Sequence, residues 1–126
     1  MGTNMSHKIL IIDDDRDVYD TLAIRLESFG YQMAWAKNGT EGYAQAKAQK
    51  PDLIFLDFNM ENESGLDVLR TLKKDPSEEI KKIPVVMLTG REEFQKACLD
   101  SGAAGYITKP FDIFGLKEIL AKYIPA

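Results

Sequence analysis

Acidic side chains stand directly after two apolar runs of the chain. Asp13 and Asp14 follow the run KILII, and Asp57 closes the run LIFLD. An ionised carboxylate at the end of an apolar strand, facing two others, is disfavoured unless a cation binds among them. Mg²⁺ prefers such hard oxygen ligands and keeps several waters, which leaves room for a phosphoryl group. The pattern therefore predicts a Mg²⁺ site at which Asp57 can act as a covalent phosphate acceptor.

A hydroxyl and an ammonium group occupy corresponding points further along the chain. Thr89 ends the run IPVVMLT, and Lys109 follows the segment GYIT. Thr89 can donate a hydrogen bond to phosphoryl oxygens, and Lys109 adds a compact cation. Each signal is weak alone, because Asp-rich turns also cap helices, a role that suits Asp15 or Asp17. The specificity lies in the arrival of all these groups, in order, at the ends of apolar runs.

Short apolar runs alternate with helix-period segments five times. Three of the runs are almost entirely apolar, as in parallel strands that are buried on both faces. The alternation predicts an open, doubly wound α/β sheet with right-handed crossovers. In such a sheet, the carboxyl ends of the strands gather at one crevice. The expected strands are residues 8–13, 31–36, 53–57, 83–89 and 104–108, and the expected helices lie within 18–29, 38–49, 64–74, 91–101 and 113–124.

The composition fits a single domain and a reducing compartment. The chain has 126 residues and a net charge of −4, which gives no reason to expect direct binding to nucleic acid or to an anionic membrane. Cys98 is the only cysteine, so an intramolecular disulfide is impossible and a reducing compartment fits. No apolar run approaches the length of a membrane span and no signal-peptide pattern begins the chain, so a cytoplasmic location is expected. Residues 1–6 are expected to be a flexible tail or cloning remnant.

Five motifs together give the chain a family resemblance. They are ILIIDDD, PDLIFLDFNM, SGLDVLRTLK, PVVMLTG and GAAGYITKPF. With them the chain resembles the receiver domain of two-component response regulators, and is similar to single-domain chemotaxis-type regulators. The resemblance implies one receiver domain over residues 7–126 with a flavodoxin-like (βα)₅ fold. It also implies a five-stranded parallel sheet of strand order 2-1-3-4-5.

The resemblance implies a set of site residues. Asp57 would be the phosphoacceptor, and Asp13, Asp14, Asp57 and the backbone carbonyl of Asn59 would hold Mg²⁺. The family also implies a cis peptide between Lys109 and Pro110, which would help to aim the lysine into the pocket. The phosphoryl donor would be a sensor histidine kinase or a histidine phosphotransfer protein. The domain would catalyse its own phosphorylation and dephosphorylation without turning over an external substrate.

The resemblance further implies a conformational switch. Thr89 and Tyr106 would be coupled, with Tyr106 moving into the space that Thr89 leaves on phosphorylation. The output surface would consist of the fourth helix, the fifth strand and the fifth helix, offered to a downstream protein effector or to a second copy in a phosphorylation-dependent homodimer. Side chains at Asn59 and Arg91 are expected to tune hydrolysis of the aspartyl phosphate.

The chain departs from the usual family pattern at several positions. Glu61 stands where a proline is common, with Glu63 close behind; these acids either form a solvated loop, or alter metal affinity or repel an anionic donor. Gly90 is smaller than the common alanine and is expected to leave the phosphoryl group accessible to water or to a partner; the alternative is that glycine only eases the turn. Phe114 and Gly115 replace the usual polar residues, either as a local adaptation of the core or as an apolar partner face.

Phe114 would form the possible partner face together with Tyr106 and Phe111. Two other side chains have structural interpretations. Trp35 is expected to pack on the sheet near the second helix, and Cys98 to be a small packing residue.

Rival functions fit the residues less well. A haloacid dehalogenase-type phosphatase would want a second Asp where Asn59 stands. A flavodoxin-type FMN carrier needs a Ser/Thr/Gly-rich phosphate loop where residues 13–15 are all Asp. A phosphorylation-independent interaction module remains the alternative to the phosphoacceptor function.

Overall fold

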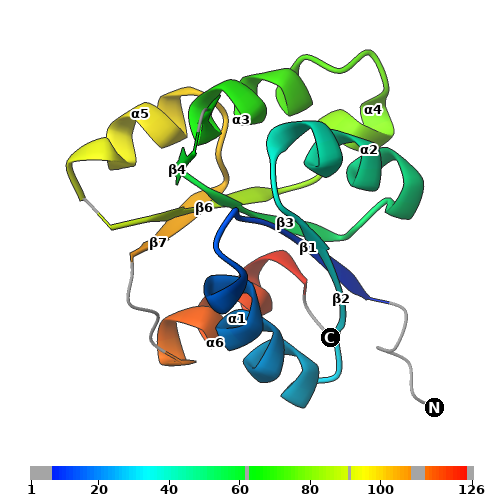
Figure 1. The fold of residues 1–126 in the computed structure, drawn as a ribbon, viewed down its shortest axis with the longest axis vertical. Coiled ribbons are helices and arrows are strands. Elements are labelled where there is room, and N and C mark those ends of the chain that lie inside the picture. The colour runs from blue at the N-terminus through cyan, green and yellow to red at the C-terminus, as the bar shows by residue number, and fades with distance from the viewer. Residues whose placement is uncertain (1–6, 62, 91, 109–112, 125–126) are drawn as a thin grey trace.

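Five parallel strands form one sheet in the computed structural model, which describes residues 7–61, 63–90, 92–108 and 113–124 (Figure 1). The strand order is β2-β1-β3-β6-β7. Counted along the chain, these strands have the order 2-1-3-4-5, so the predicted topology is confirmed. They are β1 (Lys8–Ile12), β2 (Gln32–Ala36), β3 (Leu53–Asp57), β6 (Val85–Thr89) and β7 (Gly105–Thr108).

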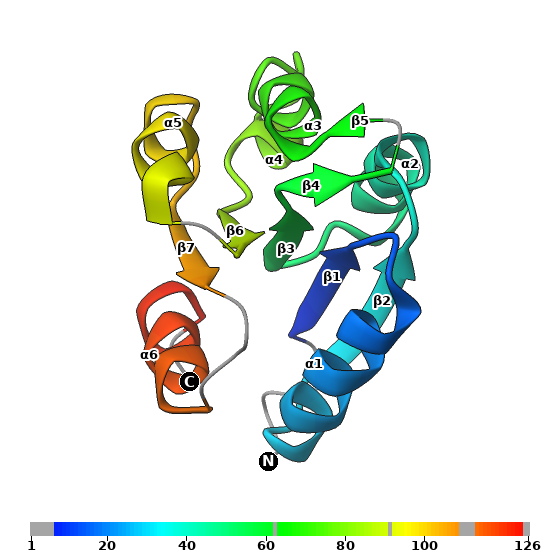
Figure 2. The same cartoon turned by 60° about the vertical axis from the view of Figure 1, so that its left-hand side comes forward.

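Helices cover both faces of the sheet (Figures 1 and 2). One face carries α1 (Arg16–Ser28) and α6 (Ile113–Tyr123). The other carries α2 (Gly39–Gln49), α3 (Gly65–Lys73), α4 (Glu78–Lys81) and α5 (Gln95–Asp100). Within the described part of the chain, no helix has the length and apolar character needed to cross a membrane.

Two apolar cores flank the sheet because successive strand residues point to opposite faces. In β1, Leu10 and Ile12 pack under the helices α2 to α5, whereas Ile9 and Ile11 pack under α1 and α6. Every residue of β3 is buried, as its continuous apolar run predicts. Burying one such Leu or Ile side chain contributes roughly 1.5–3 kcal/mol relative to leaving it exposed. The sheet is therefore a rigid base for the residues at its carboxyl edge.

Side-chain caps fix where three helices begin. Asp15 is the N-cap of α1, and its carboxylate accepts a hydrogen bond from the Asp17 backbone N–H at 2.9 Å. Asn38 caps α2 and Ser64 caps α3 in the same way. Such caps satisfy backbone donors that have no partner within the helix. The predicted capping role of Asp15 is confirmed.

Four short elements differ from the sequence prediction. The expected helix over 91–101 begins instead as a 3₁₀ turn, η2 (Glu92–Phe94), before α5, and the Phe94 ring stacks on Phe58 with 4.5 Å between centroids. Such turns are common at helix ends. The loop after β3 contains two antiparallel two-residue strands, β4 (Asn59–Met60) and β5 (Glu63–Ser64), and α4 follows α3. Elements of two to four residues carry no periodicity from which to predict them.

The expectation for Trp35 is wrong, whereas that for Cys98 is confirmed. Trp35 points to the α1 face of the sheet, and its ring lies 5.8 Å from the Tyr19 ring of α1. Strand alternation explains this, because Ala34 and Ala36 occupy the α2 face and leave the α1 face to Trp35. Cys98 is fully buried in the core beneath α2 to α5.

A buried carboxylate joins α2 to the turn after α3. Asp75 is 4% exposed; it accepts hydrogen bonds from the Tyr43 hydroxyl of α2 and, at 2.8 Å, from the backbone N–H of Ser77. These hydrogen bonds, with that of Tyr43 the largest cause, hold the pKa of Asp75 below its usual value of 3.8. The charged form of Asp75 is therefore favoured by folding.

Replacing Tyr43 with Phe should show how much the Tyr43–Asp75 hydrogen bond contributes to the stability of the fold. A folded-state pKa below the unfolded value gives stability that is present above about pH 4 and is lost as the pH falls through the folded pKa. Tyr43→Phe should therefore lower the free energy of unfolding near pH 7, and the deficit should shrink toward about pH 3. Urea unfolding of the parent and the variant at both pH values measures this difference in the free energy of unfolding.

Tyr31→Phe is the matched control, because no hydrogen bond of the Tyr31 hydroxyl is found among the described residues. An equal deficit for Tyr43→Phe at the two pH values would contradict the assignment.

Candidate metal centre

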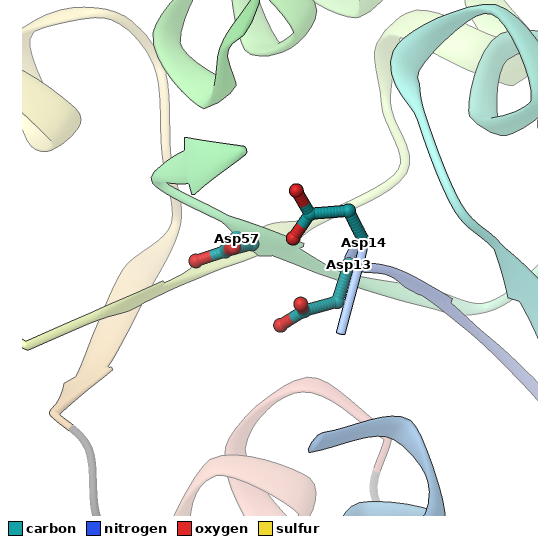
Figure 3. A group of neighbouring side chains, drawn as sticks. All are labelled: Asp13, Asp14 and Asp57. Carbon is teal, nitrogen blue, oxygen red and sulfur yellow. The ribbon is translucent and has the colours of Figure 1, made fainter. Parts of the chain in front are cut away.

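Three carboxylates meet at the carboxyl ends of β1 and β3 (Figure 3). One oxygen atom from each of Asp13, Asp14 and Asp57 lies within 4.8 Å of the others. Asp13 is fully buried, Asp57 is 4% exposed and Asp14 is exposed. The strands β1 and β3 are parallel neighbours, so their ends share one edge of the sheet. The structure thus brings together the three acids that the sequence singles out.

The donor set of this cluster fits a hard divalent cation. Three neighbouring carboxylates repel one another, and burial of two of them strengthens the repulsion. A cation among them relieves that cost, and oxygen-only ligands with one exposed member suit Mg²⁺, which keeps several waters. Asp13, Asp14 and Asp57 are the residues that would hold it. The backbone N–H of Asn59 lies 3.4 Å from Asp57 Oδ1, so Asn59 borders the cluster, and its carbonyl stays a predicted ligand.

Backbone donors hold two of the carboxylates in place. The Asp15 N–H donates to Asp13 Oδ1 at 2.9 Å, within the turn that leads into α1. The Glu61 N–H, from the loop after β3, donates to Asp14 Oδ2 at 2.6 Å. Hydrogen bonds to an ionised carboxylate stabilise its charged form. The turn after β1 and the loop after β3 are thereby joined across the site.

A close backbone contact sets the position of Asp57. A Cβ atom added at Gly65 would lie 2.0 Å from the carbonyl oxygen of Asp57 and 2.8 Å from the Cα of Phe58. The Gly65 N–H donates to the Phe58 carbonyl at 2.8 Å. Only glycine therefore lets α3 begin this close to the end of β3. The sequence signal for this contact is the Ser-Gly pair before the apolar pattern of α3.

Thr89 and Tyr106 occupy the neighbouring strand ends. Thr89 is 3% exposed at the end of β6, which pairs with β3. In β7, Tyr106 is the register partner of Met87, and Thr108 is the partner of Thr89. Residues two apart share a face, so Thr89 and Tyr106 point to the same side of the sheet. Tyr106 is half-buried there. Their coupling stays a prediction, and this geometry supports it.

Several predicted residues lie outside the described part of the chain. These are Arg91, Lys109, Pro110 and Phe111, and the side chain of Phe114 in α6 is likewise outside it. Their predicted roles in catalysis, hydrolysis and partner binding therefore stay predictions.

Two glycines that depart from the family pattern have room around them. A Cβ atom added at Gly90 or Gly115 would meet none of the described atoms within 4 Å. Neither backbone has the positive φ that favours glycine. Packing therefore does not require glycine at either position. The predicted accessibility conferred by Gly90 stays a prediction.

The two glutamates after β3 have different surroundings. Glu61 is exposed, as expected for a solvated loop. Glu63 is half-buried, and its carboxylate accepts a hydrogen bond from the Gly39 N–H in the first turn of α2. A helix N-terminus favours negative charge. The expectation of a solvated side chain is therefore wrong for Glu63, whose partner comes from a segment 24 residues away. Neither carboxylate belongs to the acidic cluster found among the described residues.

Trp35 is a site residue that the sequence interpretation missed. Its indole Nε1–H donates to the backbone carbonyl of Asp13 at 2.8 Å. The signal available in the sequence was the position of Trp35 near the carboxyl end of β2, beside the Asp-rich turn.

The sequence matches one family model over most of its length. The model is described as the response regulator receiver domain, and it matches residues 9–121. The chain is 42% identical over 117 residues to the DNA-binding dual master transcriptional regulator RpaA of Synechocystis sp., covering 91% of this chain and 46% of that protein. The chain spans about half the length of the curated relatives it matches.

Solved structures share the fold. Chemotaxis protein CheY4 of Vibrio cholerae has a TM-score of 0.85 and 27% identity, covering 94% of this chain and 98% of that one. The receiver domain of sensor histidine kinase PA1611 of Pseudomonas aeruginosa, solved with a magnesium ion coordinated in its active site cleft, has a TM-score of 0.84. It is 24% identical and covers 95% of this chain and 98% of that one.

Glu63 should contribute to stability without contributing to metal binding. Glu63→Gln keeps the size of the side chain and removes the charge at the α2 N-terminus. We expect the free energy of unfolding to fall by about 0.5–1 kcal/mol, and Mg²⁺ affinity to change less than about twofold. Urea unfolding and isothermal titration calorimetry measure the two quantities.

The matched control for this variant is Glu61→Gln, in the same loop, which should change neither quantity appreciably. A change of roughly tenfold in Mg²⁺ affinity for either variant would instead place that carboxylate in the metal site.

Proposed function

The chain belongs to the response regulator receiver domain family, and on that premise we propose that Asp57 is the phosphoacceptor of a two-component signalling switch. The observation that carries this proposal is the buried Asp57 carboxylate, held within 4.8 Å of those of Asp13 and Asp14. A carboxylate is a competent covalent acceptor when it is held in line with a phosphoryl donor.

The proposed donor is a phosphohistidine on a sensor histidine kinase or a histidine phosphotransfer protein. A carboxylate oxygen of Asp57 forms a bond to phosphorus while the bond between phosphorus and the imidazole nitrogen breaks. The electron pair of the broken bond stays on the imidazole nitrogen, and the product on Asp57 is an acyl phosphate. Later attack of water on that phosphate would restore the carboxylate and release inorganic phosphate.

The site residues divide this chemistry among them. Asp13 and Asp14, with Asp57 and the Asn59 carbonyl, would hold Mg²⁺, which when bound neutralises charge on the phosphoryl oxygens and orients donor and acceptor. The PA1611 receiver, similar in fold, holds such an ion. Lys109, after β7, would supply a cation to one phosphoryl oxygen.

Phosphorylation would bias an existing conformational equilibrium. The phosphoryl group would draw the Thr89 hydroxyl and Lys109 inward, and Tyr106 would move into the space that Thr89 leaves. The shared sheet face of Thr89 and Tyr106, on paired strands, supports this part of the proposal. Thr89 lies on the strand next to Asp57, so the movement can pass from the acceptor to β7 over two neighbouring strands.

The output surface in this proposal consists of η2 with α5, β7 and α6. Its partner would be a downstream protein effector or a second copy of the domain in a phosphorylation-dependent homodimer. The net charge of −4 gives the domain no electrostatic preference for nucleic acid, so we assign it no direct binding of that kind. A cytoplasmic location, with its reducing conditions, suits the free thiol of Cys98.

Acetyl phosphate tests the acceptor directly. Incubation with acetyl phosphate and Mg²⁺ should add one phosphoryl group to the intact mass, and the adduct should be absent in Asp57→Asn and without Mg²⁺. A folded protein that binds Mg²⁺ and yields neither this adduct nor a beryllium fluoride complex would favour a phosphorylation-independent interaction module.

Asn59 should set the lifetime of the phosphorylated state. Its backbone N–H lies 3.4 Å from Asp57 Oδ1, and its exposed side chain would orient or exclude the attacking water. Asn59→Ala and Arg91→Ala should each change the decay rate of the adduct severalfold while phosphorylation at Asp57 survives.

Decay is followed by intact mass after removal of the donor. Lys82→Ala serves as the control. Lys82 is exposed and precedes β6, so it lies near the amino-terminal ends of the strands, opposite the acidic cluster. Unchanged decay rates in both variants would count against the tuning role.

A further inference from the structure

The peptide unit between Asp13 and Asp14 is bonded to β2 through an aromatic side chain. Trp35, the only tryptophan of the chain, donates its Nε1–H to the Asp13 carbonyl oxygen at 2.8 Å. The Asp13 N–H donates to the Ala36 carbonyl at 3.0 Å. Both backbone polar groups of Asp13 are therefore held by two consecutive residues of β2.

The indole that makes this bond is itself held in place. The Arg16 guanidinium lies 4.8 Å from the centroid of the Trp35 ring and 5.2 Å from that of Tyr19, and the two rings lie 5.8 Å apart. Arg16 Nε also pairs with the Asp20 carboxylate at 2.9 Å. Ring–ring and cation–ring contacts of this kind orient an aromatic side chain. The direction of the indole N–H is thus fixed from α1.

The Asp13 carbonyl belongs to the peptide unit that links two site residues, Asp13 and Asp14. A peptide unit is planar, so fixing the Asp13 carbonyl fixes the plane that links Asp13 to Asp14. That plane sets ψ of Asp13 and φ of Asp14, and these angles direct the chain from which both carboxylates project. The Asp14 carboxylate is exposed and is held from the other side by the Glu61 N–H, so its position depends on such backbone restraints.

We propose that Trp35 is a positioning residue of the metal site, whose indole N–H holds the Asp13–Asp14 peptide so that both carboxylates face Asp57. The inference rests on the proposed function in one respect, namely that Mg²⁺ is the ion. Trp35 contacts neither the ion nor the phosphoryl group in this role. It acts through the backbone of two ligands, as hydrogen-bond partners of metal ligands commonly do.

Trp35→Phe is the direct test. Phenylalanine keeps a ring for Tyr19 and Arg16 to pack against and removes only the N–H donor and part of the ring. We expect the Kd for Mg²⁺, measured by isothermal titration calorimetry, to rise about tenfold. Met33→Ala is the matched control for lost packing, because Met33 lies on the same strand and the same face of the sheet and packs against the core beneath α1 and α6. It should lower stability in EDTA and leave the Kd within about twofold.

Equal Mg²⁺ affinity in Trp35→Phe and the parent would overturn the inference and leave Trp35 as a packing residue. An equal loss of affinity in Met33→Ala would overturn it as well, because general loosening would then explain the effect. Asp57→Asn separates a failure of the proposed metal site from a failure of the positioning role of Trp35. If parent and Asp57→Asn bind Mg²⁺ alike, the proposed metal site is wrong and the positioning role falls with it.

A second measurement needs no variant of Trp35. Since the chain has one tryptophan, its indole N–H gives one signal in a ¹H–¹⁵N NMR spectrum. That signal should exchange slowly with solvent and should shift during a Mg²⁺ titration with the Kd found by calorimetry. An indole signal that is unchanged at Mg²⁺ saturation would overturn the inference.

Discussion

The mutual repulsion of three carboxylates is the constraint around which this domain is built. Asp13, Asp14 and Asp57 lie with oxygen atoms within 4.8 Å of one another, and two of the three are buried. Left to relax, such groups would move apart. The parallel pairing of β1 with β3 prevents this separation, and backbone N–H donors hold the Asp13 and Asp14 carboxylates in place. A cation bound among them would offset the repulsion that this enforced proximity creates.

The two covered faces of the sheet make that enforcement possible. Because both faces are packed with apolar side chains, polar groups are concentrated at the strand ends, where they meet. In the proposed switch, a change in charge at Asp57 would reach Thr89 and Tyr106 through neighbouring strands of fixed register. The proposed chemistry and the proposed switch would then use the same end of the same sheet.

The sequence predicts those parts of the structure that depend on local pattern. Continuous apolar runs identify β1, β3 and β6, and the strand-end rule brings Asp13 and Asp57 together. Contacts made across the fold were beyond its reach. Both faces of β2 are apolar, so alternation alone does not tell which helix Trp35 meets, and the partner of Glu63 is a helix N-terminus that is distant in sequence. The elements α4, β4 and β5 are too short to show a period.

The close approach at Gly65 has a consequence for how this sequence can diverge. An added Cβ atom would collide with the carbonyl oxygen and carbon of Asp57 and the Cα of Phe58, all of them main-chain atoms. Every residue type carries those atoms, so no second substitution at either neighbour restores the fit. The requirement for glycine is thus independent of the rest of the sequence, and no compensating substitution allows Gly65 to be replaced. Gly90, whose added Cβ would meet none of the described atoms, is under no such packing constraint.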